Sequence, residues 1–180
     1  MFLMTTEAAY KQIDGERPMQ IAKIDYRDGL AMYVFLPREI VMNPFSILEE
    51  PISGILKERR WIKPSKLHIT MPKFSHEYEI NLVKQLLAMG MTEAFSDKAE
   101  FTGISNLPVY FSDGIHKATI DVDEEGTVAT ASTAMYARTS SSPIPRREPE
   151  YRFTADRPFG YIIRDTVAKV TLFTGVVRKF

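Results

Sequence analysis

Alternation of apolar and polar residues is the commonest pattern in this chain, and it predicts mainly β-structure. Residues 19–26 and 30–36 form two apolar, β-prone runs. They are separated by Arg27-Asp28-Gly29, and an Asp-Gly pair between two such runs is typical of a tight hairpin turn. We therefore predict a β-hairpin in this region. Four further strands are predicted at residues 109–122, 151–153, 159–163 and 170–177.

Two segments show helical spacing instead. From Pro44 to Arg60 apolar residues recur every three or four positions, but Pro51 has no backbone N–H and should divide the segment into two short helices. Residues 78–89 have the same spacing, and Gly90 suits the left-handed conformation that ends many helices. This helix is expected to pack one face against a sheet. The expected fold class is α+β and dominated by sheets.

The composition indicates one folded domain and gives few clues to a partner. The 180 residues include 44% hydrophobic and 11% aromatic side chains, which is enough for a hydrophobic core. Lysine plus arginine and aspartate plus glutamate number 23 each, so no charge excess favours nucleic acid or an anionic membrane. There is no cysteine, which excludes disulfides, and no apolar run is long enough to cross a membrane.

Three common chemistries find no support in the motifs. Residues 121–126 resemble the start of a calcium-binding loop, but Ser132 stands where a glutamate should close that loop. His68, His76 and His116 occur without the spacing or the cysteines of a zinc site. No Gly-x-Ser-x-Gly turn presents a nucleophile. We therefore expect no metal, no cofactor and no catalytic residues, and a protein that is not an enzyme.

The most informative segment is residues 116–135, where an alternating strand runs through acidic residues and one glycine into small side chains. Residues 127–137 contain no charge, proline or glycine, and Val128 is their only branched aliphatic residue. Such a segment is either a flexible linker or a strand that enters a sheet without steric conflict. Residues 139–149, rich in serine, proline and arginine, are expected to form an exposed loop. In a strand, one face would carry Thr127, Ala129, Ala131 and Thr133, and the other Val128, Thr130, Ser132 and Ala134.

Seven short motifs, in order and in register, resemble those of the serpins, a family of serine protease inhibitors. The segment from His116 to Thr127 resembles the hinge of the serpin reactive-centre loop, and Leu67–Phe74 resembles a serpin strand that ends in Pro-Lys-Phe. The resemblance as a whole extends from Tyr10 to Val177. The other matching motifs are Leu87–Phe95, Phe101–Ser105, Ala155–Phe159, Ile163–Asp165 and Leu172–Val177.

For the fold, the resemblance implies a single partial serpin domain over residues 1–180. This domain would be the C-terminal half of the serpin fold, with mostly antiparallel sheets and a few helices. Residues 1–4 then correspond to an internal segment of a serpin, and the strands that flank the insertion gap have no counterpart here. The family favours an extracellular, secreted protein, with the cytoplasm as the alternative. A signal peptide and a heparin-binding helix would both lie in the absent half.

The resemblance also implies roles for individual residues. The reactive-centre loop would span about 126–149, and its small residues would allow it to enter a sheet. Glu124 is expected to pair with Lys73, and His116 corresponds to a histidine beneath the opening sheet. Pro158 and Phe159 are expected to be structural. The hinge would consist of Glu124, Glu125, Gly126, Thr127, Ala129 and Ala131.

The implied function is inhibition by a suicide-substrate mechanism. A target serine protease cleaves the loop, stays attached as an acyl-enzyme, and is trapped when the freed loop inserts into a sheet as a new strand. The family's usual spacing from Glu124 places the scissile bond at Ser140–Ser141. Arg138–Thr139 suits a trypsin-like protease by charge, so elastase-like and trypsin-like targets both stay open.

The alternative function is that of a non-inhibitory serpin fragment or binding protein, which is cleaved without trapping a protease. Because the strands that flank the gap are absent, the isolated chain is expected to be a substrate. It is also expected to self-associate through its open sheet edge or by loop–sheet contacts.

Overall fold

A computed structural model describes residues 2–6, 8–48, 52–57, 61–64, 67–123 and 150–179. The chain divides into two compact units, which are taken separately below. The larger unit comprises Met1–Phe74 and Val122–Phe180, and the smaller one comprises Ser75–Asp121.

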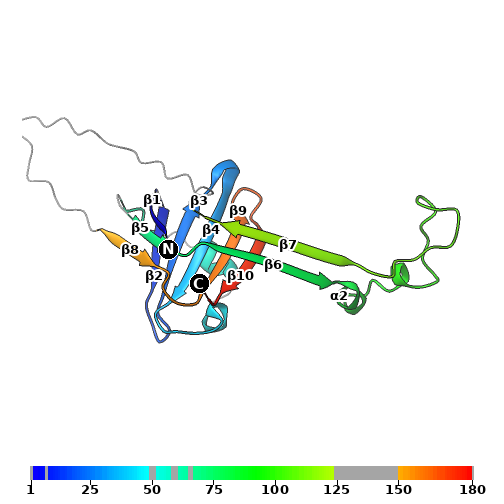
Figure 1. Ribbon diagram of the computed structural model, residues 1–180, viewed down its shortest axis with the longest axis horizontal. Coiled ribbons are helices and arrows are strands. Elements are labelled where there is room, and N and C mark those ends of the chain that lie inside the picture. The colour runs from blue at the N-terminus through cyan, green and yellow to red at the C-terminus, as the bar shows by residue number, and fades with distance from the viewer. Residues whose placement is uncertain are drawn as a thin grey trace, which may run out of the picture. The chain divides into compact units, whose positions relative to one another are not determined.

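A five-stranded antiparallel sheet forms the centre of the larger unit (Figure 1). Its central strand, β4 (Leu30–Pro37), pairs with β3 on one side and β9 on the other. Residues 31–36 of β4 are all at most 5% exposed, so both faces of this strand are covered. In spatial order the strands are β10 (Val170–Val177), β9 (Phe159–Asp165), β4, β3 (Met19–Asp25) and β2 (Ala8–Ile13).

The hairpin predicted from the sequence is confirmed. The 3₁₀-helix η1 (Arg27–Gly29) joins β3 to β4, and the φ angles of Asp28 and Gly29 are 59° and 77°. The backbone N–H of Leu30 donates to the carbonyl of Arg27 and closes the turn. Aspartate and glycine tolerate this left-handed backbone better than most residues, which explains the Asp-Gly pair at this point.

A second sheet in the larger unit contains β1 (Phe2–Thr6), β5 (Leu67–Met71) and β8 (Tyr151–Thr154). Strand β1 is antiparallel to β5, whereas β8 is parallel to it. The sheets of the described chain are therefore mostly antiparallel, as expected, with this one parallel pair. Three alternate residues of β5, Leu67, Ile69 and Met71, are fully buried, which is the period-two pattern of a strand with one face on a core.

Two short helices follow β4, in agreement with the prediction. The first, η2 (Pro44–Ile47), is a 3₁₀-helix that starts at Asn43, whose Oδ1 accepts a hydrogen bond from the Phe45 N–H at 3.1 Å. The second, α1 (Ile52–Lys57), begins directly after Pro51. Residues of both helices pack against a buried cluster formed by Met19, Ile21, Ala31, Tyr33, Phe35, Ile55 and Ile162.

The smaller unit is built on a two-stranded sheet of β6 (Phe74–Asn81) and β7 (Ile115–Val122). Two helices, α2 (Val83–Ala88) and η3 (Glu93–Phe95), lie between these strands in the sequence. Gly90 ends α2 with φ at 94°, as predicted. The N–H groups of Gly90 and Met91 donate to the carbonyls of Leu87 and Leu86, both at 3.0 Å, which is the Schellman arrangement.

Three expectations for the smaller unit are wrong. Residues 78–81 belong to β6 and not to a helix, because Tyr78 and Ile80 alternate with polar neighbours and so fit a strand as well as a helix. Strand β7 begins at Ile115 and not at Val109, because the preceding residues are held in a loop by Asn81. Helix α2 contains no buried residue, so the structure does not show the expected packing of one helix face.

Candidate functional site

The predicted reactive-centre loop lies outside the described residues, which stop at Asp123 and resume at Glu150. The hinge and scissile-bond assignments therefore stay predictions. They concern Glu124, Glu125, Gly126, Thr127, Ala129, Ala131, Arg138, Thr139, Ser140 and Ser141. The structure does describe the two strands that hold the ends of this segment.

Strand β7 holds the N-terminal end of the loop. Its last residue, Val122, is 8% exposed and belongs to the larger unit, whereas most of the strand is exposed. Lys117 of β7 forms an ion pair with Glu77 of β6. Because side chains alternate between the faces of a strand, Ala118, Ile120 and Val122 share the face opposite Lys117, whereas Ile115 lies on the same face as Lys117.

Strand β8 holds the C-terminal end of the loop. Tyr151 and Phe153 pair in register with Leu67 and Ile69 of β5, and Phe153 is fully buried. The ring of Tyr151 also packs against the ring of Tyr10, with centroids 5.2 Å apart. In the sequence, the predicted loop is therefore bounded by strands of two different sheets, and each strand contains a buried side chain.

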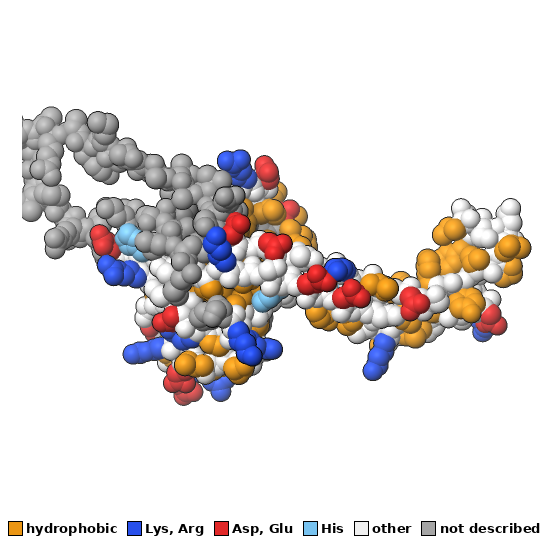
Figure 2. All heavy atoms as spheres, viewed as in Figure 1, with side chains coloured by type: hydrophobic (Ala, Val, Ile, Leu, Met, Phe, Trp, Pro, Cys, Tyr) orange, Lys and Arg blue, Asp and Glu red, His pale blue; other side chains and the backbone are white. Residues whose placement is uncertain are grey.

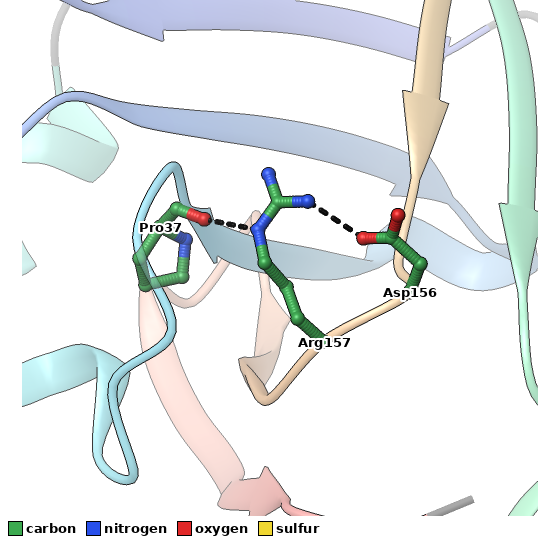
Figure 3. A network of polar contacts seen from close by, with 3 residues as sticks. All are labelled: Pro37, Asp156 and Arg157. Carbon is green, nitrogen blue, oxygen red and sulfur yellow. Dashed lines mark hydrogen bonds and ion pairs between the residues drawn. The ribbon is translucent and has the colours of Figure 1, made fainter.

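The segment after β8 is attached to the central sheet by Arg157 (Figure 3). Its Nε donates to the carbonyl of Pro37 at 2.7 Å, and its Nη1 contacts the Asp156 carboxylate at 2.6 Å. Phe159 follows and is fully buried, with its ring 5.8 Å from that of Phe74, while Pro158 is half-buried. These contacts fix the passage from β8 to β9, immediately after the loop.

The two other predicted site residues are Lys73 and His116. Lys73 lies between β5 and β6 and is exposed, and its predicted partner Glu124 is outside the described residues. His116 is the second residue of β7 and is also exposed. The structure therefore leaves the Lys73–Glu124 pair and the role of His116 as predictions.

Several residues that position the loop ends were not predicted from the sequence. Arg157, Tyr10 and Tyr151 act through partners that are far away in the sequence, and nothing in the local pattern identifies those partners. The motif Ala155–Phe159 was the one local signal that covered part of this region.

The described residues contain no cluster of three or more histidine, aspartate or glutamate side chains able to hold a metal ion. The histidines considered for zinc are distributed over three strands, with His68 in β5, His76 in β6 and His116 in β7. Among the helices that are described, none is long and apolar enough to cross a membrane.

The comparison with known proteins identifies the family. A family model described as serpin (serine protease inhibitor) matches residues 1–180. The chain belongs to the serpin family. Human neuroserpin is 35% identical over 164 residues, which cover 88% of this chain and 38% of neuroserpin. An uncharacterized serpin-like protein of Methanosarcina acetivorans is 34% identical over 172 residues, which cover 88% of this chain and 37% of that protein.

Solved serpin structures show the same fold. Native protease nexin-1, crystallised with heparin, superposes with a TM-score of 0.68 at 22% identity, over 98% of this chain and 46% of the nexin chain. The native state of the thermophilic serpin tengpin superposes with a TM-score of 0.62 at 27% identity, over 99% of this chain and 46% of tengpin. The chain thus spans less than half the length of these serpins. The α+β, sheet-dominated fold class predicted from the sequence is confirmed.

Proposed function

We propose that this chain carries the reactive-centre loop of a serpin-type serine protease inhibitor, together with one strand of the sheet that receives the loop. The observation that carries the proposal is the sequence directly after β7. Three acidic residues, a glycine and then a run of small residues follow a strand whose end is anchored by Val122. A strand that continues into small residues can fold back and pair with β7 without steric conflict.

The proposed chemistry is that of an interrupted peptide hydrolysis. The serine of the protease attacks the carbonyl carbon of the scissile bond, the peptide bond breaks, and the new amino terminus leaves with a proton. An ester then joins the loop to the protease. Insertion of the loop beside β7 moves the attached protease and distorts its active site before water can hydrolyse the ester.

Two bonds are proposed for cleavage. The Ser140–Ser141 bond is supported by the number of residues that separate it from Glu124, which is the usual spacing in the family. The Arg138–Thr139 bond is supported by the preference of trypsin-like proteases for a basic side chain. Pro143 and Pro145 follow both bonds, and because proline cannot donate to a sheet ladder, the inserted strand should end before them.

A second function is favoured by one specific observation. The resemblance alone led us to expect that both strands flanking the insertion gap are absent, whereas in this proposal β7 is one of them. Among the described strands, β7 has a single neighbour, β6, so the second flanking strand is not in the described part of this chain. By itself the chain would then be cleaved by a protease without trapping it.

The experiment that separates the two functions uses trypsin and elastase with a longer serpin that contains these residues. A covalent complex that survives a denaturing gel is expected for the parent protein. Thr127→Arg should abolish the complex and leave only cleavage, because an unpaired charge would be buried on insertion. Thr130→Arg is the matched control: it lies on the opposite face of the predicted strand and should keep the complex. Cleavage of the parent protein without a complex would support the second function.

A further inference from the structure

A pocket of about 620 Å³ lies in the larger unit beside the end of β2. It is lined by residues of β2, the β2–β3 turn, η2 and α1, and by Ile62 and Tyr151. Its volume is within the range of small-molecule sites, about 300–1,000 Å³. None of the predicted residues of protease inhibition lines it.

One side of the pocket is apolar and continuous with the hydrophobic core. Met19 and Ile55, which are 2% and 3% exposed, belong to the main core cluster, and Ile47 and Leu48 pack against that cluster. Ile62 is 42% exposed and lies at the surface of the pocket. An apolar ligand body that enters this side would remove water from side chains already backed by the core.

The other side of the pocket carries three charged side chains among the described residues, Lys11, Asp14 and Arg17. Lys11 is the one charged side chain among the described residues that is classed as buried, at 8% exposure. Arg17 is exposed and makes no hydrogen bond or ion pair within the described residues. The opposing charge is Asp14, whose Oδ1 accepts a hydrogen bond from Nε2 of Gln12 at 2.6 Å. Among the described lining residues, Arg17 is therefore the charged group that can pair with one anionic group of a ligand.

We propose that this pocket binds a small amphipathic carboxylate. The apolar body would lie against Met19, Ile55 and Ile62, and the carboxylate would pair with the guanidinium of Arg17. Arginine is suited to this role because its planar fork presents two parallel N–H donors to a carboxylate. The predicted hinge and scissile-bond residues do not line the pocket, but Tyr10 and Tyr151, which position the C-terminal end of the predicted loop, do.

Trp61, the only tryptophan of the chain, provides a direct readout, because it is adjacent to Ile62 and its ring lies 5.8 Å from that of Tyr33. The test titrates the 180-residue chain with dodecanoate below its micellar concentration while the fluorescence of Trp61 is recorded. A saturable change with one site per chain is expected. The uncharged alcohol of the same chain length should bind at least about tenfold more weakly, because it cannot form the charged hydrogen bonds.

Three variants complete the test. Arg17→Gln should weaken dodecanoate binding by about tenfold or more and leave the alcohol unaffected. Ile62→Glu should abolish the binding of both dodecanoate and the alcohol. Because Ile62 is 42% exposed, we expect this variant to fold. Arg27→Gln changes an exposed arginine of the β3–β4 turn and should bind as the parent does. Circular dichroism verifies that each variant is folded. No saturable binding by the parent, or binding that is unchanged in both Arg17→Gln and Ile62→Glu, would overturn the proposal.

Discussion

Gly160 lies in β9 directly beside an aromatic ring of the core. A Cβ atom at this position would lie 2.7 Å from Cζ of Phe45. The Phe45 ring is itself held edge-on against Phe35, with centroids 5.5 Å apart. The missing side chain therefore allows η2 to approach the central sheet closely.

Gly160→Ala is expected to lower the free energy of unfolding by about 1–3 kcal/mol, because the added methyl group overpacks this contact. Urea unfolding measured by the fluorescence of Trp61 gives the value. Gly103→Ala is the control, since a Cβ there meets nothing within 4 Å, and it should change stability by less than about 0.5 kcal/mol. An equal decrease in the free energy of unfolding of the two variants would contradict the packing argument.

Tyr161 gives a second prediction at the scale of single residues. It is 3% exposed, and burial raises the pKa of its phenol above the ordinary value of 10.0. Burial raises the pKa of Tyr10 and Tyr33 as well. Above that ordinary value, the unfolded chain loses these protons more readily than the folded one. Stability should therefore be fully present below about pH 10 and fall as the pH rises further.

The measurement is urea unfolding at a series of pH values from about 8 to 11. Tyr161→Phe should make the loss of stability at high pH smaller, because one of the buried phenols is gone. Tyr110→Phe, at a side chain that is 60% exposed, is the control and should leave the slope unchanged. If the stability of the parent protein increased as the pH was raised beyond about 10, the predicted direction of the pH dependence would be wrong.

At the scale of elements, Asn81 joins three parts of the smaller unit. Its Oδ1 accepts hydrogen bonds from the backbone N–H groups of Val83 at 3.0 Å and Gly114 at 3.4 Å. Its Nδ2 donates to Oδ1 of Asp113 at 2.9 Å. One side chain therefore connects the end of β6, the first turn of α2 and the loop that leads to β7.

Asn81→Ala should increase the rate of amide hydrogen exchange in α2 and β7, because three hydrogen bonds that hold these elements together are lost. Exchange measured by mass spectrometry resolves the two elements from the larger unit, whose rates should not change. Asn106→Ala alters an exposed asparagine of the same unit and serves as control. Similar exchange in α2 and β7 of the two variants would rule out the connecting role of Asn81.

The sequence predicted elements best where pattern and turn chemistry agreed. Strand β10 has the predicted bounds, and the β3–β4 hairpin forms around the predicted Asp-Gly turn. Residues 78–81 were wrongly predicted as helix because the positions of Tyr78 and Ile80 fit both the spacing of a helix and the alternation of a strand. The pairing of β4 with β9 could not be predicted, since residues more than 120 positions apart meet and no local pattern encodes that contact.

At the scale of the whole molecule, large apolar side chains of β7 and β10 remain exposed in the described chain. Ile115 of β7 is 70% exposed, and Val170 and Leu172 of β10 are 53% and 49% exposed. Figure 2 shows further hydrophobic side chains on the surface of the smaller unit. Exposed apolar strands are typical of surfaces that pack against another segment, and the related serpins are more than twice as long as this chain.

The candidate site was predicted in a different way from the fold. The limits of the predicted loop and of its hinge were inferred from the resemblance of residues 116–127 to the serpin hinge. The anchors could not be predicted, because the hydrogen bond from Arg157 to Pro37 depends on how β8 and β4 are brought together. The cleavage position therefore stays a prediction, and the structure added the contacts of the strands on either side of the predicted loop in the sequence.

The most direct test of this account is the mass of the C-terminal peptide released when the 180-residue chain is treated briefly with trypsin and with elastase. We expect the first cut between Ala137 and Ser142, and no covalent complex on a denaturing gel, because β7 has no second neighbouring strand among the described residues. A first cut elsewhere would contradict the assignment of the reactive-centre loop. A protease-trapping monomer made from these residues alone would contradict the need for the other half of the fold.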